Sequence, residues 1–456
     1  MNKSRIKYVC QNCGYESLRW LGKCPECMEW NTLAEEMAKP KTSHAATVGT
    51  VQNIKSISQL SPTDNIRIAT NIKEFDRVLG GGLIIGSVVL IAGDPGIGKS
   101  TLVMQAVSNI KFDVSSSRSK VIYVTGEESA EQLKYRSERL KLKSENVFIL
   151  PETNLNDILF TLEKNEPAVA VIDSIQTIFK PELGTAPGTV GQIRESTAYL
   201  MQLAKKKMIT VLIIGHVTKD GAIAGPKLLE HIVDTVLQFG GEKNYSFRIL
   251  RAMKNRFGST NEIGIFEMHD TGLVEVSNPS EVFLSQREYG ASGSVVTSVI
   301  EGTRPILVEV QALVTPSNYG MPQRVTTGFD YRRLSILLAV LEKRLGYKLS
   351  SQNVFLNIAG GVDIDEPAAD LAVCAAVISS IKDIPADSKT CVVGEVGLGG
   401  EIRSIHQLEK RIQEAEKLGF EKILLPKSNS KIGEKKYKIS VIEVKTLKEV
   451  LQYLFN

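Results

Sequence analysis

The 456-residue sequence has no uninterrupted apolar run near the roughly 18 residues that a membrane-spanning helix needs. Its start, MNKSRIKYVC, carries cations but lacks the apolar stretch that follows them in a signal peptide. Cysteines are few, six in all, and no export signal accompanies them, so we expect reduced thiols. These absences predict a cytoplasmic protein without a membrane anchor.

Strong net charge is also absent, because the formal balance is only +4, and this value alone favours no particular partner. The run KKK at 205–207 is a local basic patch, which we interpret as a solvated helix face. Hydrophobic residues make up 43% and charged residues 23% of the chain, as in soluble globular proteins.

The chain divides into blocks of different pattern. Residues 1–33 hold four of the six cysteines, and residues 34–60 are small and polar without periodicity, which predicts a linker. Over 61–280 the continuous apolar runs SVVLIAG, VIYVTG, AVAVID and ITVLIIGH alternate with helical segments such as STAYLMQLAKKK. Such runs are typical of parallel strands covered on both faces, so this block is predicted to be an α/β domain. Residues 285–456 mix strand formers with helical segments such as DYRRLSILLAVLEKRLG, which predicts an α+β domain.

The cysteine cluster has the pattern C-x2-C, ten residues, C-x2-C, formed by Cys10, Cys13, Cys24 and Cys27. Each pair turns tightly enough to bring both thiolates to one ion, and four thiolates close a tetrahedron around Zn²⁺. Disulfides or free thiols are the alternatives, and the cytosol disfavours disulfides. A closed four-cysteine site is structural rather than catalytic, because it leaves no position for water. The remaining cysteines, Cys374 and Cys391, lie in apolar surroundings and are expected to be buried thiols.

The segment GDPGIGKS after the strand SVVLIA fits the phosphate-loop pattern G-x-x-x-x-G-K-[ST], and a helical segment follows it. The backbone N–H groups of such a loop surround phosphates at a helix N-terminus. Lys99 is expected to reach the β- and γ-phosphates, Ser100 to bind Mg²⁺, and Thr101 to lie near the α-phosphate. The nucleotide site is therefore predicted to comprise Gly93, Asp94, Pro95, Gly96, Ile97, Gly98, Lys99, Ser100 and Thr101.

Hydrolysis also needs an acid at the metal and a base for water. Asp173 ends the strand AVAVID and is the candidate for the metal, whereas Glu127 and Glu128 follow another strand. We favour Glu127 as the residue that orients water, with Glu128 as the alternative. His216 ends the strand ITVLIIGH and is either a γ-phosphate sensor or an ordinary core or surface histidine.

The segment RAMKNRFGST places Lys254 and Arg256 two positions apart, so on a strand both side chains share one face. Like charges repel, and we therefore expect an anion opposite them. The candidates are a phosphate, a nucleic acid and a neighbouring carboxylate.

The order of these motifs resembles the RecA-like ATPases. The zinc quartet ahead of RVLGGGL, GDPGIGKST, GEES, VIDSIQT, GHVTKDG and KNRFG is similar to the bacterial RadA (Sms) family over the whole chain. One departure is Asn71 in TNIKEFDRVL, where glycine is expected; it bears on a local turn only. The resemblance implies ATP between adjacent subunits of a ring, a homo-hexamer, with Lys254 and Arg256 of one subunit reaching the nucleotide of the next.

The resemblance also implies two DNA-binding loops, at 179–195 and 218–227. Sequence-independent contact with the phosphate backbone is the expected mode, because no aromatic cluster accompanies these loops. The expected phosphate contacts are Lys180, Arg194, Lys219 and Lys227.

The third block resembles the proteolytic domain of Lon. Ala368 occupies the position of the catalytic serine, and Glu409, with Lys410 one residue on, that of the lysine. Alanine has no nucleophilic hydroxyl, so we expect a scaffold without protease activity.

The main functional prediction is a DNA-dependent ATPase and DNA motor, with Mg²⁺, ATP and zinc as cofactors. It would load on single-stranded or branched DNA, with the recombinase RecA as a partner, in recombinational repair. A KaiC-like regulatory ATPase or autokinase, and a nucleotide-switched recombination mediator without motor activity, are the alternatives.

Overall fold

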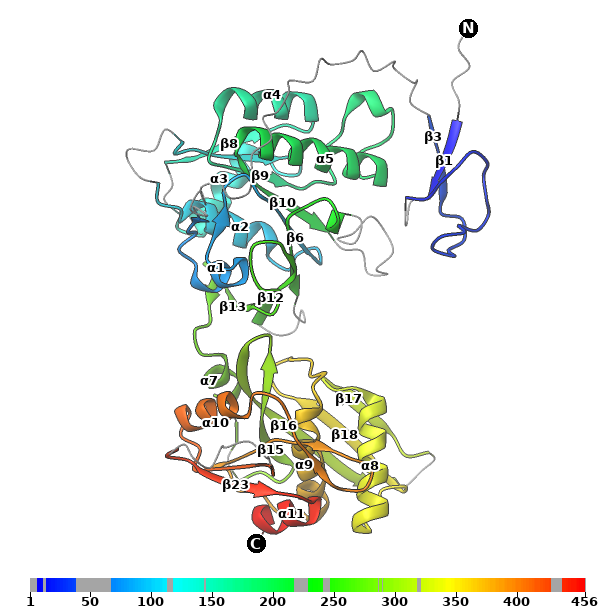
Figure 1. The fold of residues 1–456 in the computed structure, drawn as a ribbon, viewed down its shortest axis with the longest axis vertical. Coiled ribbons are helices and arrows are strands. Elements are labelled where there is room, and N and C mark those ends of the chain that lie inside the picture. The colour runs from blue at the N-terminus through cyan, green and yellow to red at the C-terminus, as the bar shows by residue number, and fades with distance from the viewer. Residues whose placement is uncertain are drawn as a thin grey trace, which may run out of the picture. The chain divides into compact units, whose positions relative to one another are not determined.

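The chain forms two compact units, residues 1–275 and 276–456 (Figure 1). The computed structural model describes residues 6–10, 14–37, 67–112, 118–142, 145–216, 229–240, 247–285, 287–288, 290–317, 321–427 and 437–455. Among these residues, no helix combines the length and the apolar character that a membrane span requires.

The cysteine-bearing part of the first unit is a small antiparallel sheet with strand order β2-β1-β3. Its strands are β1 (Ile6–Cys10), β2 (Glu16–Ser17) and β3 (Leu33–Met37).

A nine-stranded sheet forms the rest of the first unit, in the order β14-β13-β12-β11-β6-β10-β9-β7-β8. The strands from β11 to β8 are parallel, and β12, β13 and β14 extend the sheet in antiparallel fashion. A short pair, β4 (Arg67–Ile68) and β5 (Leu83–Ile84), precedes it. The strands of the large sheet are β6 (Val88–Gly93), β7 (Val121–Thr125), β8 (Val147–Pro151), β9 (Val169–Asp173), β10 (Thr210–His216), β11 (Thr235–Gly240), β12 (Phe247–Asn255), β13 (Ile263–His269) and β14 (Gly272–Glu275).

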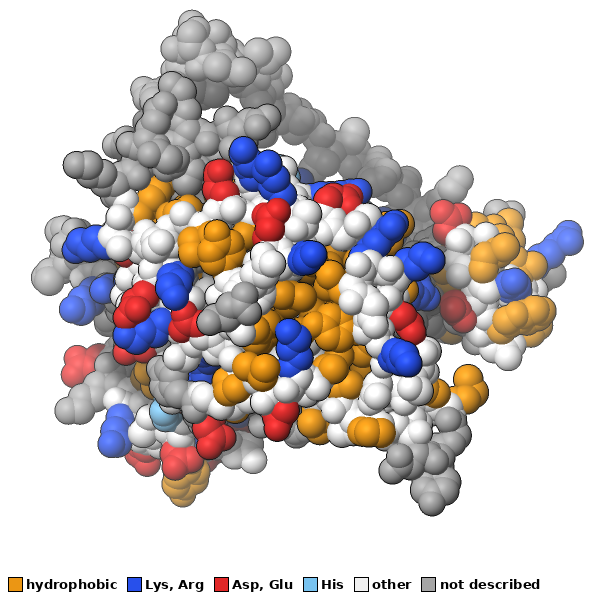
Figure 2. All heavy atoms as spheres, turned by 90° about the horizontal axis from the view of Figure 1, so that it is seen from below, with side chains coloured by type: hydrophobic (Ala, Val, Ile, Leu, Met, Phe, Trp, Pro, Cys, Tyr) orange, Lys and Arg blue, Asp and Glu red, His pale blue; other side chains and the backbone are white. Residues whose placement is uncertain are grey.

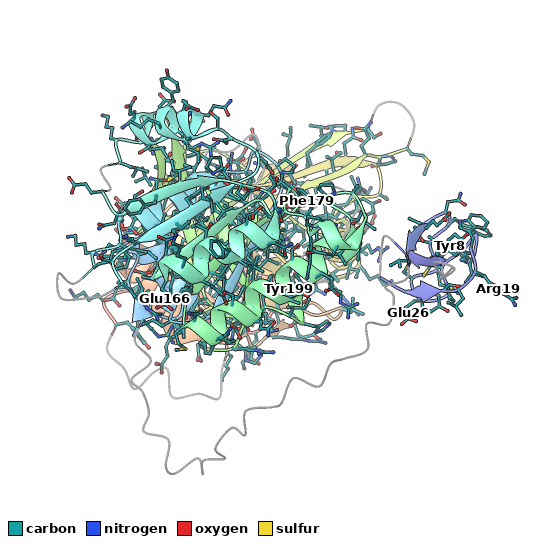
Figure 3. All side chains as sticks on the ribbon, turned by 90° about the horizontal axis from the view of Figure 1, so that it is seen from above. Tyr8, Arg19, Glu26, Glu166, Phe179 and Tyr199 are labelled. Carbon is teal, nitrogen blue, oxygen red and sulfur yellow. The ribbon has the colours of Figure 1, made fainter. Side chains whose placement is uncertain are left out.

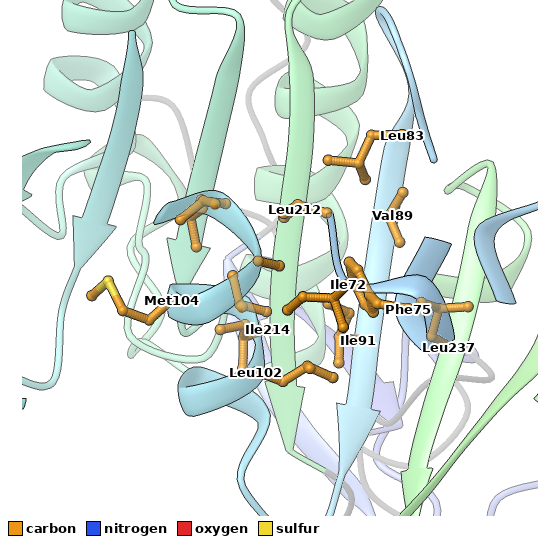
Figure 4. Close-up of a cluster of buried hydrophobic side chains, with 14 of the residues drawn as sticks. Ile72, Phe75, Leu83, Val89, Ile91, Leu102, Met104, Leu212, Ile214 and Leu237 are labelled. Atoms are coloured by element: carbon orange, nitrogen blue, oxygen red, sulfur yellow. The ribbon is translucent and has the colours of Figure 1, made fainter. Parts of the chain in front are cut away.

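Helices cover both faces of this sheet, which is why its strands have continuous apolar runs. Val89 and Ile91 of β6 pack into one core cluster, and Val88 and Leu90 into another, as the alternation of side chains along a strand requires. The first cluster, shown in Figure 4, includes residues of α1, α2 and α3, and the second includes residues of α4 and α5. These helices are α1 (Lys73–Leu79), α2 (Lys99–Ser108), α3 (Ala130–Arg139), α4 (Leu155–Asn165) and α5 (Val190–Lys207). The four predicted strands and the α/β class are confirmed.

Asn71, the departure from glycine, has a left-handed backbone with φ of +59°. Asparagine tolerates this region better than most residues. Its amide donates a 2.8 Å hydrogen bond to the carbonyl oxygen of Asn109, so the side chain also ties the turn to the end of α2.

The second unit is built on a seven-stranded sheet with strand order β17-β18-β16-β15-β19-β22-β23. Asp330 caps the predicted helix α8, and Gly346 ends it with φ of +78°. Hydrophobic side chains gather on the face of this unit drawn in Figure 2. Cys374 and Cys391 are fully buried, as predicted. The elements are α7 (Pro279–Leu284), β15 (Ser294–Glu301), β16 (Arg304–Pro316), β17 (Arg324–Thr327), α8 (Tyr331–Leu345), β18 (Gln352–Ile358), η3 (Pro367–Ala369), α9 (Asp370–Lys382), β19 (Thr390–Val392), β20 (Glu395–Val396), β21 (Ile402–Arg403), α10 (Leu408–Lys417), β22 (Lys422–Pro426), β23 (Ser440–Val444) and α11 (Leu447–Phe455).

Candidate nucleotide site and metal centre

The predicted phosphate loop lies at the carboxyl end of β6, where the parallel strands β10, β9 and β7 also end. Ligands of open α/β sheets bind at this edge. Gly96 and Gly98 have φ of +79° and +112°, which a residue with a side chain rarely adopts. At Gly93, a Cβ atom would lie 2.2 Å from the carbonyl oxygen of Phe239, so only glycine fits. Asp94, Pro95 and Ile97 complete the loop, and Lys99, Ser100 and Thr101 form the first turn of α2.

Lys99 is buried inside the loop. Its ammonium group donates hydrogen bonds of 2.8 Å to the carbonyl oxygens of Gly93 and Asp94 and lies 3.1 Å from Nδ1 of His216. Burial lowers the pKa of Lys99 to about 8, although the carboxylates of Asp173, Asp94 and Glu127 oppose this shift.

Asp173, the predicted metal acid, ends β9 and is almost completely buried. It accepts a 2.5 Å hydrogen bond from the hydroxyl of Tyr123. Burial raises the pKa of Asp173, and the hydroxyls of Tyr123 and Ser100 partly oppose the effect. The two predicted Mg²⁺-binding residues, Ser100 and Asp173, therefore lie close together.

The two acids after β7 point to different partners. Glu127 accepts a 2.5 Å hydrogen bond from Ser174 and lies 3.4 Å from Nε2 of His216. The hydrogen bond from His216 is the largest cause that lowers the pKa of Glu127 to about 2. Glu128 instead forms an ion pair with Arg136 of α3. Glu127 alone of the two therefore contacts residues of the phosphate site through its side chain.

These residues suit a nucleotide with Mg²⁺. A hydroxyl and a carboxylate are the hard oxygen ligands that Mg²⁺ prefers, and Ser100 and Asp173 supply one of each. The loop backbone with Lys99 would hold the phosphates, as loops of this pattern do.

Lys254 and Arg256 lie at the opposite end of the same sheet. Lys254, near the end of β12, donates to the carbonyl oxygens of Glu230 and Val233, the latter at 2.9 Å. Arg256 follows the strand, and its guanidinium lies 3.5 Å from the carboxylate of Asp234. Burial and then the charge of Arg256 lower the pKa of Lys254. Within one chain, a neighbouring carboxylate thus faces this pair of cations.

The cysteine cluster has the geometry of a zinc site. The Sγ atoms of Cys10, Cys24 and Cys27 all lie within 4.8 Å of one another, and those of Cys10 and Cys27 are 3.7 Å apart. Four thiolates at the usual Zn–S distance stand about 3.8 Å apart in a tetrahedron, so these atoms fit the ion. Cys13 lies outside the described residues.

Both cysteine turns use the same backbone pattern. Gly14 N–H donates to the carbonyl of Cys10, and Met28 N–H donates to that of Cys24, each at 2.9 Å. Gly14 and Met28 are both left-handed, with φ of +77° and +61°. Arg19 points away from this small sheet (Figure 3).

Three family profiles match separate parts of the chain: a rubredoxin metal-binding domain over residues 8–35, KaiC over 68–148, and the ChlI subunit of Mg-chelatase over 318–429. Full-length similarity is to proteins named DNA repair protein RadA. The protein of Bacillus subtilis is 50% identical over 457 residues, which cover 99% of both chains. That of Listeria monocytogenes is 51% identical and covers 99% of this chain and 98% of its own. The chain belongs to the RadA family.

A solved KaiC-like protein of Pyrococcus horikoshii is 22% identical, with a TM-score of 0.38, and covers 46% of this chain and 99% of that one. The RadA-family assignment confirms the predicted RecA-like ATPase core with a zinc ribbon before it and a Lon-like region after it.

Two of the four cations expected in the DNA-binding loops of this RadA-family chain are described. Arg194 is exposed, and the ammonium of Lys180 lies 3.7 Å from the ring centroid of Tyr199. Lys219 and Lys227 lie outside the described residues. The expected loop 179–195 is shorter than predicted, because α5 begins at Val190 and Arg194 is helical.

In the Lon-like region, Ala368 is only 1% exposed, whereas Glu409 and Lys410 are exposed on α10. Lys410 donates to the carbonyl oxygen of Thr303. The buried cation of α10 is Arg411, whose guanidinium pairs with Glu366.

Sequence reasoning missed two sets of residues near the sites. A pocket of about 390 Å³ lies beside Glu128; the other residues lining it are Gln132, Tyr135, Arg136 and Arg139. Their spacing along one face of the helix after GEES is the signal that would have found them. Asp234, whose carboxylate pairs with Lys205 and Arg256, gave no local signal in the sequence.

Proposed function

We propose that this chain is a DNA-dependent ATPase that moves DNA strands during homologous recombination and recombinational repair. It acts in the cytoplasm as a homo-hexameric ring on single-stranded or branched DNA, together with the recombinase RecA. ATP lies between adjacent subunits of the ring. Membership of the RadA family and the predicted ATPase residues support this proposal.

One observation supports the proposal that two neighbouring subunits share each ATP molecule. Asp234 N–H donates to the carbonyl of Val88, so the Lys254 and Arg256 cluster lies where β6 begins. The phosphate loop starts where β6 ends, at Gly93. At a rise of about 3.3 Å per residue these ends are about 17 Å apart, which a lysine or arginine side chain does not span. Cations at this end of the sheet therefore serve a nucleotide only if another subunit holds it.

Assembly is supported by an apolar row on the second unit. Leu313 of β16 pairs with Phe355 of β18, which pairs with Val325 of the edge strand β17. Leu313 and Val325 are 57% and 48% exposed. Contiguous exposed apolar side chains mark surfaces that bind other proteins. A second copy of the chain would cover this row in the ring.

In hydrolysis, each residue of the site has a distinct task. The loop backbone and Lys99 hold the phosphates, and Ser100 and Asp173 hold the metal, which supplies charge neutralisation when bound. Glu127 is ionised, because its pKa is lowered to about 2, and it orients the attacking water. Lys254 and Arg256 of the neighbouring subunit stabilise negative charge that develops on the transferred phosphoryl group. The Lon-like region acts as a scaffold without peptidase activity.

The KaiC match over residues 68–148 favours one second candidate, a regulatory ATPase or autokinase. Such a protein would transfer phosphate to itself, and DNA would not accelerate its turnover.

The test is steady-state ATP hydrolysis with and without single-stranded DNA, for the wild type, Lys254→Ala and Arg256→Ala, with nucleotide and DNA binding titrated in parallel. We expect DNA to stimulate the wild type, and both variants to lose turnover while they retain DNA binding. Loss of DNA binding with basal turnover intact would instead show that Lys254 and Arg256 bind DNA. Absence of DNA stimulation in the wild type, with phosphate incorporated into the protein, would favour the autokinase.

A further inference from the structure

A buried carboxylate organises the cations at the start of β6. The side chain of Asp234 is 2% exposed. One of its oxygens accepts hydrogen bonds from Val88 N–H at 3.0 Å and from the ammonium of Lys205 at 2.8 Å. The other oxygen lies 3.5 Å from Arg256. A single carboxylate thus holds two cations that come from different elements, α5 and the segment after β12.

Lys205 is distinct from its two neighbours in the KKK run. Lys206 and Lys207 pair with Glu163 and Glu166, at 3.6 and 2.7 Å. Lys205 turns to Asp234, and its ammonium lies 5.7 Å from the ring centroid of Phe257, next to Arg256 in sequence. Lys205 and Lys206 are exposed, as expected of a solvated helix face, and Lys205 in addition pairs with Asp234 beside Lys254 and Arg256.

The charged residues around Asp234 favour the binding of an anion. Lys205 and Arg256 pair with the carboxylate of Asp234, and the charges of Asp234 and Glu230 act on Lys254. Among the described residues of this group, three cations thus stand against two carboxylates. Polyphosphate oxygens attract ammonium and guanidinium groups strongly, with several acceptors for each cation.

We propose that Lys205 is a third cation that contacts the triphosphate bound by the neighbouring subunit, and that Asp234 is the positioning residue that holds Lys205 and Arg256 toward it. This inference rests on the proposed shared nucleotide site. The ion pairs keep both long side chains in one place before the nucleotide arrives, so less conformational entropy is lost at the site during catalysis. Val88 N–H anchors the carboxylate itself to the sheet.

The chain offers a matched control for this assignment. Lys206 is the next residue on the same helix, carries the same charge and pairs with Glu163 away from the cluster. The experiment compares full-length Lys205→Ala, Lys205→Arg, Lys206→Ala, Asp234→Asn and Arg256→Ala. It measures kcat and KM for ATP with single-stranded DNA, DNA affinity and melting temperature.

We expect Lys205→Ala to lower kcat at least about 10-fold, as loss of a cation at a phosphoryl-transfer site does, with KM for ATP and DNA affinity little changed. Lys205→Arg should recover part of this loss, and Lys206→Ala should match the wild type. Asp234→Asn can still accept the hydrogen bond from Val88, yet it loses the charge that holds the cations. Its kcat should fall toward that of Arg256→Ala.

The outcomes separate this inference from the proposed function. If Arg256→Ala loses turnover while Lys205→Ala behaves like Lys206→Ala, Lys205 is not a nucleotide contact, and the shared site stands. If neither variant loses turnover, the shared site itself is wrong, and the inference fails with it. If Lys205→Ala loses DNA affinity but keeps basal turnover, the cation serves the DNA path instead. If Lys205→Ala is unfolded enough to explain its lost turnover, as its melting temperature would show, Lys205 has only a structural role.

Discussion

The ammonium group of Lys99 lies 3.1 Å from Nδ1 of His216, and this contact assigns the tautomer of the imidazole. An ammonium group only donates hydrogen bonds, so Nδ1 must accept and is unprotonated. The proton of the neutral ring is then on Nε2, which faces Glu127 at 3.4 Å. His216 thereby links Lys99 to Glu127, the two residues to which we assign phosphate binding and the orientation of water.

Lys99 should cause the activity of the enzyme to fall at alkaline pH. Burial lowers its pKa to about 8, so the free enzyme loses this cation as the pH rises through that value. Bound phosphates favour the charged form and raise the pKa again. We therefore expect kcat/KM, which reports the free enzyme, to fall above about pH 8, and kcat to fall only at higher pH. Steady-state profiles measure both.

The control for this fall in activity is Lys254→Arg, because Lys254 is the other described lysine of the ATPase domain whose pKa is lowered. The activity that this variant retains should still fall above about pH 8. Profiles of kcat and kcat/KM that fall together near pH 8 would contradict the assignment to Lys99.

Glu127→Gln and Glu128→Gln form a matched pair of neighbouring substitutions. Glu127→Gln should lower kcat at least about 100-fold with ATP binding retained, because the base that orients water is lost. Glu128→Gln breaks the ion pair with Arg136 and should keep kcat within about 10-fold of the wild type. Single-turnover hydrolysis and nucleotide titration measure both effects. If Glu128→Gln lowers kcat more than Glu127→Gln does, Glu128 is the residue that orients water.

The nucleotide site could largely be predicted from the sequence because its signals are local. Continuous apolar runs identified the strands that end at Gly93, Asp173 and His216, and the glycine pattern identified the loop. Since parallel strands end at one edge of the sheet, these residues had to meet.

Contacts that depend on tertiary packing could not be predicted in this way. Lys205 and Asp234 are 29 residues apart, and the packing of α5 against β6 and β10, with β11 beside β6 in the sheet, brings them together. The early start of α5 has a similar cause, because the buried amide of Gln192 bonds to the backbone of Lys180 and Thr185. No local pattern in the sequence encodes either contact.

Zinc binding is tested by Cys24→Ser combined with Cys27→Ser. The two substitutions remove half of the predicted ligands, so the protein should lose about one zinc ion per chain. Cys374→Ala is the control, since this thiol is buried in the second unit and its pKa is raised by burial. Elemental analysis should find normal zinc in the control. Unchanged zinc in the double variant would rule out the cysteine quartet as the site.

Ala368→Ser should create no peptidase. The new hydroxyl would be buried, and Lys410 is exposed and bonded to the carbonyl of Thr303. Arg411 is the buried cation of α10, but it pairs with Glu366, and a guanidinium does not act as a base near neutral pH. Casein cleavage, compared with the wild type, measures the activity. Cleavage by the variant would show that another residue serves as the base.

The most direct test of the shared nucleotide site is to mix two inactive variants before the ring assembles. Lys99→Ala lacks the loop cation but keeps Arg256, whereas Arg256→Ala lacks the cation given to the neighbour but keeps Lys99. Each variant alone should have almost no ATPase activity with single-stranded DNA.

In an equal, random mixture of the two, about one interface in four pairs an intact loop with an intact Arg256, because subunits meet head to tail in a ring. We predict recovery of about a quarter of the wild-type turnover from this geometry. A mixture that stays as inactive as its components, although the subunits exchange, would show that Lys99 and Arg256 serve the same chain and would contradict the account.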